Sequence, residues 1–191
     1  MKPKSQLRSE FLEKRNKLSA AELNEKSSAI ALKLLASSEF KSAKAIFCYV
    51  SFNSEVETHF FIKESLKLGK KVAVPHVDFK YEKMMPSLIK NFERDLEKTR
   101  IGILEPKEFA INPVEPEELD LIIVPGVVFD LHGHRVGSGK GYYDKFLEKI
   151  HSGAKLIGIA FDLQILGKIA KEEHDIKMHK IITEKRVINC E

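Results

Sequence analysis

The sequence predicts a layered α/β protein, a single domain over residues 1–191 with an open, mostly parallel sheet and helices on both faces. Three observations support this prediction. The 191 residues, 43% of them hydrophobic, are enough for one full core and too few for two. A strand, helix, strand order occurs twice, which is the signature of parallel crossovers. No internal repeat, low-complexity tract or Ser/Pro-rich linker marks a boundary.

Two helices are expected before any strand. When residues are placed about 100° apart, the first helix has an apolar stripe with a basic stripe beside it. These stripes hold Leu7, Phe11 and Leu18, and Lys4, Arg8 and Arg15, respectively. Ser19 and Glu22 then form a capping box that begins a second helix. We expect the basic stripe to border the buried seam.

The two crossover units follow. The first consists of a strand at 45–50, a helix at 58–68 that ends at Gly69, and a strand at 72–74. The second consists of a strand at 121–124, a Gly-rich loop, a helix at 142–150 and a strand at 156–161. Between the units, the segment from Tyr81 to Pro116 is less regular and could hold edge strands or a flap. The tail after His174 is expected to add a hairpin-like pair.

Bulk properties exclude several classes of protein. The net charge of +4 is spread along the chain, the aromatic residues are dispersed and no recognition motif occurs, so we expect no nucleic-acid partner. No apolar run approaches the roughly 18 residues of a membrane span, and residues 1–9 are too charged for a secretory leader. We therefore expect a cytoplasmic protein without membrane association. Cys48 and Cys190 have neither metal-ligand nor disulfide spacing and are expected to be reduced thiols.

The candidate ligand site is the run 135–144, which follows the strand at 121–124. Sheets of this class bind ligands outside the carboxyl ends of their strands. Glycines alternate in the run at Gly137, Gly139 and Gly141. They let backbone N–H groups approach an anion, and the next helix points its positive end to the same place. Because Arg135 and Lys140 add positive charge, the run predicts a phosphate-binding site.

Two familiar phosphate motifs do not fit this run. A P-loop needs Ser or Thr after its Lys, whereas Gly141 follows Lys140. A dinucleotide fingerprint needs a short turn, whereas more than ten residues separate the strand end from Gly137. A flexible turn entering an ordinary helix therefore remains an alternative. In that helix Tyr143 shares the core-facing stripe, and Asp144 is either a partner of the helix dipole or a ligand for Mg²⁺.

Six pieces of the sequence match one known family in the family's order. They are Lys4-x-x-Leu7-Arg8, Tyr49-Val-Ser-Phe-Asn-Ser-Glu55-Val-Glu57-Thr58, Gly102-Ile-Leu-Glu-Pro106, Pro125-Gly-Val-Val-Phe-Asp130, Gly137-x-Gly139-x-Gly141-Tyr-Tyr-Asp144, and Gly158-Ile-Ala-Phe161 with the later His174-Asp175. In these pieces the chain resembles the 5-formyltetrahydrofolate cyclo-ligases, also called 5,10-methenyltetrahydrofolate synthetases. One matching piece would be weak evidence for the family, but six pieces over nearly the whole chain are highly specific evidence.

The resemblance implies a catalytic domain that shares its sheet in outline with sugar-phosphate isomerases and CoA transferases. The implied reaction converts 5-formyltetrahydrofolate and ATP to 5,10-methenyltetrahydrofolate, ADP and phosphate, with Mg²⁺ required. Phosphorylation of the formyl oxygen creates a leaving group, after which N10 attacks. That chemistry needs positioning and charge neutralisation rather than a protein nucleophile. Consistently, the sequence has no nucleophile elbow, no Cys–His spacing and no zinc motif.

The resemblance also implies roles for particular residues. The ATP site comprises Lys4, Arg8, Arg135, Val136, Gly137, Ser138, Gly139, Lys140, Gly141, Tyr142 and Tyr143. The folate site comprises Val50, Glu55, Ser138, Gly139, Lys140, Gly141 and Tyr142. The metal ligands are Asp144 and Asp175, and the expected catalytic residues are Arg135, Lys140 and Tyr142. Glu55 follows a strand end, where its carboxylate could accept paired hydrogen bonds from the pterin. Many members carry Arg or an aromatic residue where this chain has Ser138, so one pocket wall differs here.

Two other functions remain open at this point. A sugar-phosphate isomerase-like enzyme would need neither Lys4 and Arg8 nor ATP. A non-catalytic nucleotide or folate binder would keep its binding residues but lose the carboxylates of Asp144 and Asp175, which are present here. We expect a monomer whose partners are small-molecule substrates.

Overall fold

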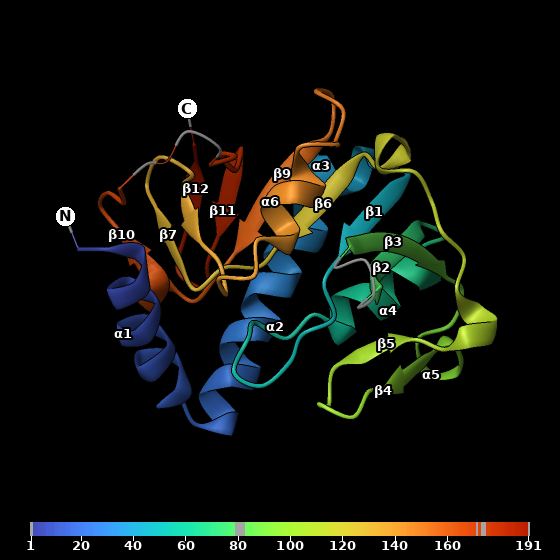
Figure 1. Ribbon diagram of the computed structural model, residues 1–191, viewed down its shortest axis with the longest axis horizontal. Helices are drawn as coiled ribbons and strands as arrows, with labels where there is room; N and C mark the ends of the chain where they lie inside the picture. Colours follow the sequence, from blue (N-terminus) through green and yellow to red (C-terminus); the bar gives the residue numbers. More distant parts are fainter. Residues whose placement is uncertain (1, 79–82, 171, 173–174, 191) are drawn as a thin grey trace.

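The computed structural model describes residues 2–78, 83–170, 172 and 175–190 (Figure 1). Tyr81 and His174, which bound two of the expected segments, lie outside these residues. Among the described residues, no helix is both long enough and apolar enough to cross a membrane.

A seven-stranded sheet forms the centre of the molecule, in the order β12-β11-β9-β6-β1-β2-β3. Its strands are β1 Ala45–Cys48, β2 Lys71–Asp78, β3 Lys83–Ile89, β6 Leu121–Val124, β9 Lys155–Ile159, β11 Lys180–Ile182 and β12 Val187–Asn189. The inner pairs β2/β1, β1/β6, β6/β9 and β9/β11 are parallel, and only the edge pairs β2/β3 and β11/β12 are antiparallel. The predicted open, mostly parallel sheet is confirmed, as is the hairpin-like pair in the tail.

Helices cover both faces of this sheet, as the sequence predicts. On one face lie α2 Ala20–Ala36, α3 Ser38–Ser42 and α4 His59–Lys67, whereas α6 Tyr142–Leu147 lies on the other (Figure 1). Successive strand residues point to opposite faces. In β1, Ile46 and Cys48 therefore join the core under α2 and α4, while Phe47 packs against Phe146 of α6.

The first helix, α1 Lys4–Asn16, packs on a separate small sheet of β10 Ile165–Leu166, β7 Val128–Asp130 and β8 Arg135–Val136 (Figure 1). Its apolar stripe is confirmed for Leu7 and Phe11, which are buried in a cluster with Val128 and Val136. Leu18, the third residue expected in the stripe, lies beyond the end of the helix and packs against the main core. Arg15, expected at the border of this seam, is itself buried. The strands of this sheet were not predicted, because two or three residues carry too little periodicity to be recognised.

Boundaries differ from the prediction where tertiary contacts decide them. The capping box of Ser19 and Glu22 is confirmed, and α4 ends before Gly69, whose φ of +76° is left-handed. The strand expected at 72–74 is longer because β2 extends beyond β1 to pair with β3. The helix expected at 142–150 ends at Leu147. The irregular segment before Pro116 holds α5 Phe92–Asp95 and the hairpin of β4 Leu96–Lys98 and β5 Leu104–Pro106. Short 3-10 turns occupy Glu108–Ala110, Pro116–Glu118 and Asp162–Gln164.

Two glycines let the small sheet lie close to the large one. A Cβ on Gly126 or on Gly158 would lie 2.5 Å from the ring of Phe129, a fully buried residue of β7. The side-chain amide of Gln164 holds the backbone after β6 in position, because it donates to the carbonyl oxygens of Gly126 and Val127 at 3.0 and 2.9 Å. The segment that follows β6 is thereby held at the carboxyl end of the sheet.

Candidate functional site

A cavity of about 730 Å³ lies where β1 and β6 end. Tyr49 and Val50, which follow β1, and Pro125 and Gly126, which follow β6, are part of its wall. The cavity is therefore outside the carboxyl ends of parallel strands, where this fold class binds ligands. All the predicted site residues line it: Lys4, Arg8, Val50, Glu55, Arg135, Val136, Gly137, Ser138, Gly139, Lys140, Gly141, Tyr142, Tyr143, Asp144 and Asp175.

The Gly-rich run and α1 together form a cationic wall of this cavity. The Arg8 Nε donates to the carbonyl oxygen of Gly137 at 2.8 Å, which ties the helix to the run. Gly139 has a φ of +99°, and a Cβ there would lie 3.3 Å from the Arg8 guanidinium carbon. Gly141, with a φ of +70°, begins α6 without a side-chain cap. The glycines therefore serve both a left-handed backbone and a close approach of the arginine.

Arg135 is a nearly buried cation at the centre of this wall. Its side chain is 5% exposed, and its Nη2 donates to the Asp144 carboxylate at 2.7 Å. Burial lowers the pKa of Arg135, and the charges of Asp144 and Asp175 oppose that shift. The guanidinium lies 5.8 Å from the centre of the Tyr143 ring, and its Nε has no hydrogen-bond partner among the described residues. A donor is thus available in a buried position next to the cavity.

Lys4 and Asp175 form a second ion pair on the same wall. The ammonium donates to both carboxylate oxygens, at 2.7 and 2.9 Å, and lies 3.1 Å from Glu172. Although burial acts in the opposite direction, hydrogen bonds to Asp175 and Glu172 raise the pKa of Lys4. Burial alone would raise the pKa of Asp175, but the hydrogen bond with Lys4 acts against burial, and the pKa is lowered overall. Both partners are therefore charged.

The two predicted metal ligands are carboxylates that already have cationic partners. Asp144 pairs with Arg135 and Asp175 with Lys4, and no cluster of three or more His, Cys, Asp or Glu residues that could hold a metal ion occurs in the described part of the chain. Mg²⁺ takes oxygen ligands and commonly uses one or two carboxylates together with substrate phosphates. The carboxylates of Asp144 and Asp175 therefore fit a magnesium ion that arrives with a polyphosphate.

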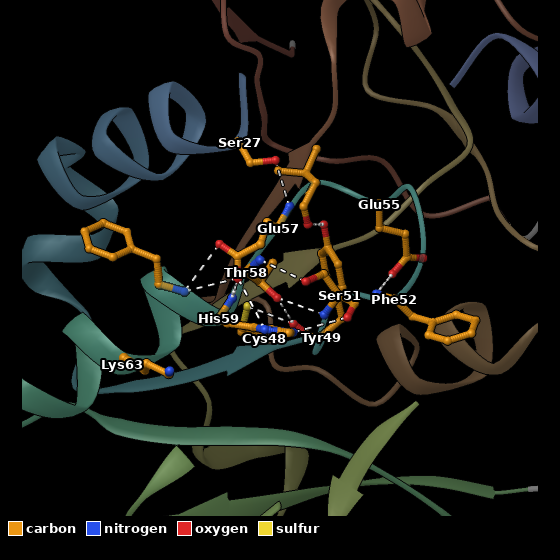
Figure 2. A network of polar contacts seen from close by, with 12 residues as sticks. Ser27, Cys48, Tyr49, Ser51, Phe52, Glu55, Glu57, Thr58, His59 and Lys63 are labelled. Atoms are coloured by element: carbon orange, nitrogen blue, oxygen red, sulfur yellow. Dashed lines mark hydrogen bonds and ion pairs between the residues drawn. The ribbon is translucent and has the colours of Figure 1, made fainter. Parts of the chain in front are cut away.

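Glu55 is held at the cavity by a tightly bonded turn (Figure 2). Ser51 and Thr58 exchange backbone and side-chain hydrogen bonds of 3.0 and 3.1 Å across the turn. The Glu55 carboxylate accepts the backbone N–H of Phe52 at 3.0 Å. Burial raises its pKa, against the effects of that hydrogen bond and of the charge of Arg15. Since only one N–H group in this turn bonds to the carboxylate, it retains acceptor capacity toward the cavity.

The structure also reveals wall residues that the sequence did not indicate. The β4–β5 hairpin brings Ile103 and Glu105 to the cavity, and Gly102, with a φ of +88°, packs against Phe52. The only signal for this wall was the piece from Gly102 to Pro106, to which no role was assigned. Tyr143 packs against Phe47 and Phe146, as its stripe predicts, and lines the cavity as well.

An open, mostly parallel sheet with cations and glycines at the carboxyl ends of its strands defines an α/β protein of the class that binds ligands at that edge of the sheet. The comparisons with known proteins narrow this class. Residues 1–184 match the model of the 5-formyltetrahydrofolate cyclo-ligase family, so the chain belongs to that family. The resemblance found in the sequence is thereby confirmed.

Relatives and solved structures agree over nearly the whole chain. The 5-formyltetrahydrofolate cyclo-ligase of Mus musculus is 33% identical, with 93% of this chain and 92% of that protein covered. A probable 5-formyltetrahydrofolate cyclo-ligase of Caenorhabditis elegans is also 33% identical, with coverages of 97% and 94%. The structure of Aquifex aeolicus 5,10-methenyltetrahydrofolate synthetase superimposes with a TM-score of 0.86 at 33% identity, covering 97% of this chain and 92% of that one. The structure of the 5,10-methenyltetrahydrofolate synthetase from Mycoplasma pneumoniae superimposes with a TM-score of 0.77 at 26% identity, covering 96% of this chain and 99% of that one.

Proposed function

We propose that this protein catalyses the ATP- and Mg²⁺-dependent cyclisation of 5-formyltetrahydrofolate to 5,10-methenyltetrahydrofolate, with release of ADP and phosphate. The observation that carries the proposal is that every residue expected in the ATP, folate and metal sites lines one cavity. These residues come from distant parts of the chain, including Lys4, Glu55 and Asp175. Two substrates that must react with each other require a shared cavity of this kind.

The cationic wall would hold the triphosphate of ATP. Arg8 and Arg135 offer guanidinium groups, Lys4 and Lys140 offer ammonium groups, and the Gly-rich run offers backbone N–H groups. Arg135 and Lys4 are paired with carboxylates before the ligand binds. Phosphate oxygens would replace those partners and leave the carboxylates available to a cation.

The folate would lie on the wall that holds Val50 and Glu55. A carboxylate can accept two parallel hydrogen bonds from the adjacent amino and ring N–H groups of a pterin. Burial raises the pKa of Glu55 although the Phe52 N–H and the charge of Arg15 oppose that shift, so further donors from a ligand would stabilise the carboxylate. Binding of the pterin would supply the missing donors and place the formyl group near the phosphates.

The reaction then consists of two bond exchanges. The formyl oxygen forms a bond to the γ-phosphorus as the bond to ADP breaks. N10 next forms a bond to the formyl carbon, and loss of the N10 proton and of phosphate leaves the cyclic methenyl product. Arg135, Lys140 and Tyr142 would stabilise the charge that develops on the transferred group. A magnesium ion held by Asp144 and Asp175 would neutralise phosphate charge.

The proposal also covers the domain organisation, the oligomeric state and the cellular location of the protein. The whole chain acts as one catalytic domain, and the protein acts as a monomer. We also propose a cytoplasmic location, although one plant relative is named as a mitochondrial enzyme.

An absorbance assay of methenyl product tests the proposal. Purified protein with 5-formyltetrahydrofolate should form product only when both ATP and Mg²⁺ are added. Asp144→Asn should lower the rate about 100-fold or more, because a charged group that acts on the phosphates is lost. Glu118→Gln removes an exposed charge that does not line the cavity, and it should leave the rate unchanged.

The same assay distinguishes the other two functions. Folded protein that binds ATP or folate but forms no product under any condition would be a binder. Folded protein that binds neither would contradict both, and an isomerase of sugar phosphates would then be the remaining hypothesis.

A further inference from the structure

Glu105 of β5 is a buried carboxylate on the cavity wall that the proposed reaction leaves without a role. The residue is 9% exposed and lines the cavity. Among the described residues, its hydrogen-bond donor is the backbone N–H of Val77, and the ring Nδ1 of His76 lies 3.8 Å away. A carboxylate has about four lone-pair sites. The residues that the structure describes therefore use only a small part of its acceptor capacity.

Other buried carboxylates of this protein are much better satisfied. Asp130 accepts the backbone N–H groups of His132, His134 and Ile169, each at 2.9 Å. Asp95 accepts two backbone N–H groups at 2.8 Å and the Arg94 guanidinium at 2.6 Å, and its pKa falls to about 2, with the arginine as the largest cause. Burial instead raises the pKa of Glu105. Neither Asp130 nor Asp95 lines the cavity, whereas Glu105 does.

A second unsatisfied group lies beside Glu105. The His76 Nδ1 is buried and has no hydrogen-bond partner in the part of the chain that the structure describes. Val77, Met84 and Leu104 line the cavity together with Glu105, whereas His76 is not among the residues that line it. Buried polar groups left without partners cost stability and are characteristic of functional sites. The place suits a flat, largely apolar ligand with an N–H donor at its edge.

We infer that Glu105 is a second carboxylate that recognises the folate, accepting a hydrogen bond from an N–H group of the reduced pterin. The inference rests on the proposed function. A tetrahydropterin carries N–H donors on several edges, so two carboxylates can bind it at once. Adenine has one amino group, flanked by acceptor nitrogens that a carboxylate would repel, and the phosphates of ATP belong on the cationic wall. Glu105 therefore contributes to selection of the folate and not of the nucleotide.

Equilibrium binding tests this assignment. The affinities for 5-formyltetrahydrofolate and for a non-hydrolysable ATP analogue with Mg²⁺ are measured by titration calorimetry, each ligand alone and in the presence of the other. Glu105→Gln keeps the side-chain volume but replaces one acceptor oxygen with a donor. The folate Kd should rise roughly 10- to 100-fold, as expected for loss of a hydrogen bond to a charged group, while the nucleotide Kd stays within about twofold.

Two further variants separate recognition from structure. Glu108→Gln removes an exposed carboxylate three residues along the chain and should change neither affinity. Glu105→Asp keeps the charge but withdraws it by one methylene, so it should also weaken folate binding. In the absence of ligands, Glu105→Gln should melt at or above the temperature of the wild type, because a poorly compensated charge is removed.

The outcomes distinguish this inference from the proposed function. If the wild type binds no folate under any condition, the proposed function fails. If the wild type binds folate and Glu105→Gln binds it equally well, only the role of Glu105 is wrong. Equal losses of folate and nucleotide affinity, together with a lower melting temperature, would also overturn that role, because they indicate a structural residue.

Discussion

The two walls of the cavity hold their charges in opposite ways. On the cationic wall, Lys4 and Arg135 each contact a carboxylate at 2.7 Å, so their charges are compensated before any ligand binds. The folate wall is the part of the cavity that holds Glu55 and Glu105, where the folate is proposed to bind. Burial raises the pKa of both carboxylates there, and each shift is opposed by one backbone N–H donor and one nearby basic side chain, Arg15 for Glu55 and His76 for Glu105. The first wall must exchange partners when its ligand arrives, whereas the second gains partners. We therefore expect substitutions on the two walls to affect stability with opposite signs.

The largest effect is expected at Arg135. Arg135→Gln removes the buried guanidinium next to the expected phosphates, and the rate of product formation should fall about 1,000-fold or more, as for arginines that stabilise phosphoryl transfer. The melting temperature should also fall, because Asp144 loses its partner. Arg100→Gln is the matched control, since Arg100 is exposed and does not line the cavity. A near-normal rate in folded Arg135→Gln would show that the cationic wall is not where the phosphates bind.

A smaller effect is expected at Gly139, where the backbone of the Gly-rich run lies against the Arg8 side chain. Gly139→Ala would strain a φ of +99° and place a methyl group 3.3 Å from the Arg8 guanidinium. With a cost of roughly 1–2 kcal/mol for the left-handed backbone, the KM for ATP should rise about tenfold as the run shifts. Gly69→Ala is the matched control: its φ is +76° but nothing lies within 4 Å of the added Cβ. That variant should lose stability with an unchanged KM. If both variants behave alike, the packing of Arg8 on Gly139 has no role in ATP binding.

The cationic wall could be predicted from the sequence, whereas much of the folate wall could not. The glycines and cations of 135–144 are adjacent in the chain, and the preceding strand places them at the carboxyl end of a sheet. Lys4 was visible through the stripe on its helix, but only the fold brings its ammonium to Asp175. Glu105 was not identified, because it lies on a three-residue strand, and its burial depends on packing against β2. Periodicity reports which face of a long element is apolar but not which short hairpin closes a cavity.

The smallest effect is expected for Glu55→Gln, whose stability is measured as a function of pH. This variant tests directly whether substitutions on the two walls change stability with opposite signs. Because the folded pKa of Glu55 is raised above 4.5, the folded state holds more protons than the unfolded state just above that pH, and wild-type stability falls as pH rises through this window. Glutamine does not titrate, so the stability contributed at this position does not fall as pH rises. The variant should therefore melt a few degrees higher at pH 7, where 1 kcal/mol corresponds to about 2–4 °C in a chain of this size, and the gain should vanish below pH 4.5.

Lys4→Met is the matched variant on the other wall. It leaves Asp175 without its main partner, so its melting temperature should fall at pH 7. Since the folded pKa of Asp175 is lowered, the stability from this pair is present above the ordinary value of 3.8 and is lost as pH falls below it, and the two melting curves should converge there. Melting temperatures from pH 3 to 8 measure both variants together. If Glu55→Gln is less stable than the wild type at pH 7, the Phe52 N–H and the charge of Arg15 compensate the carboxylate fully, and the folate wall is not destabilised when empty.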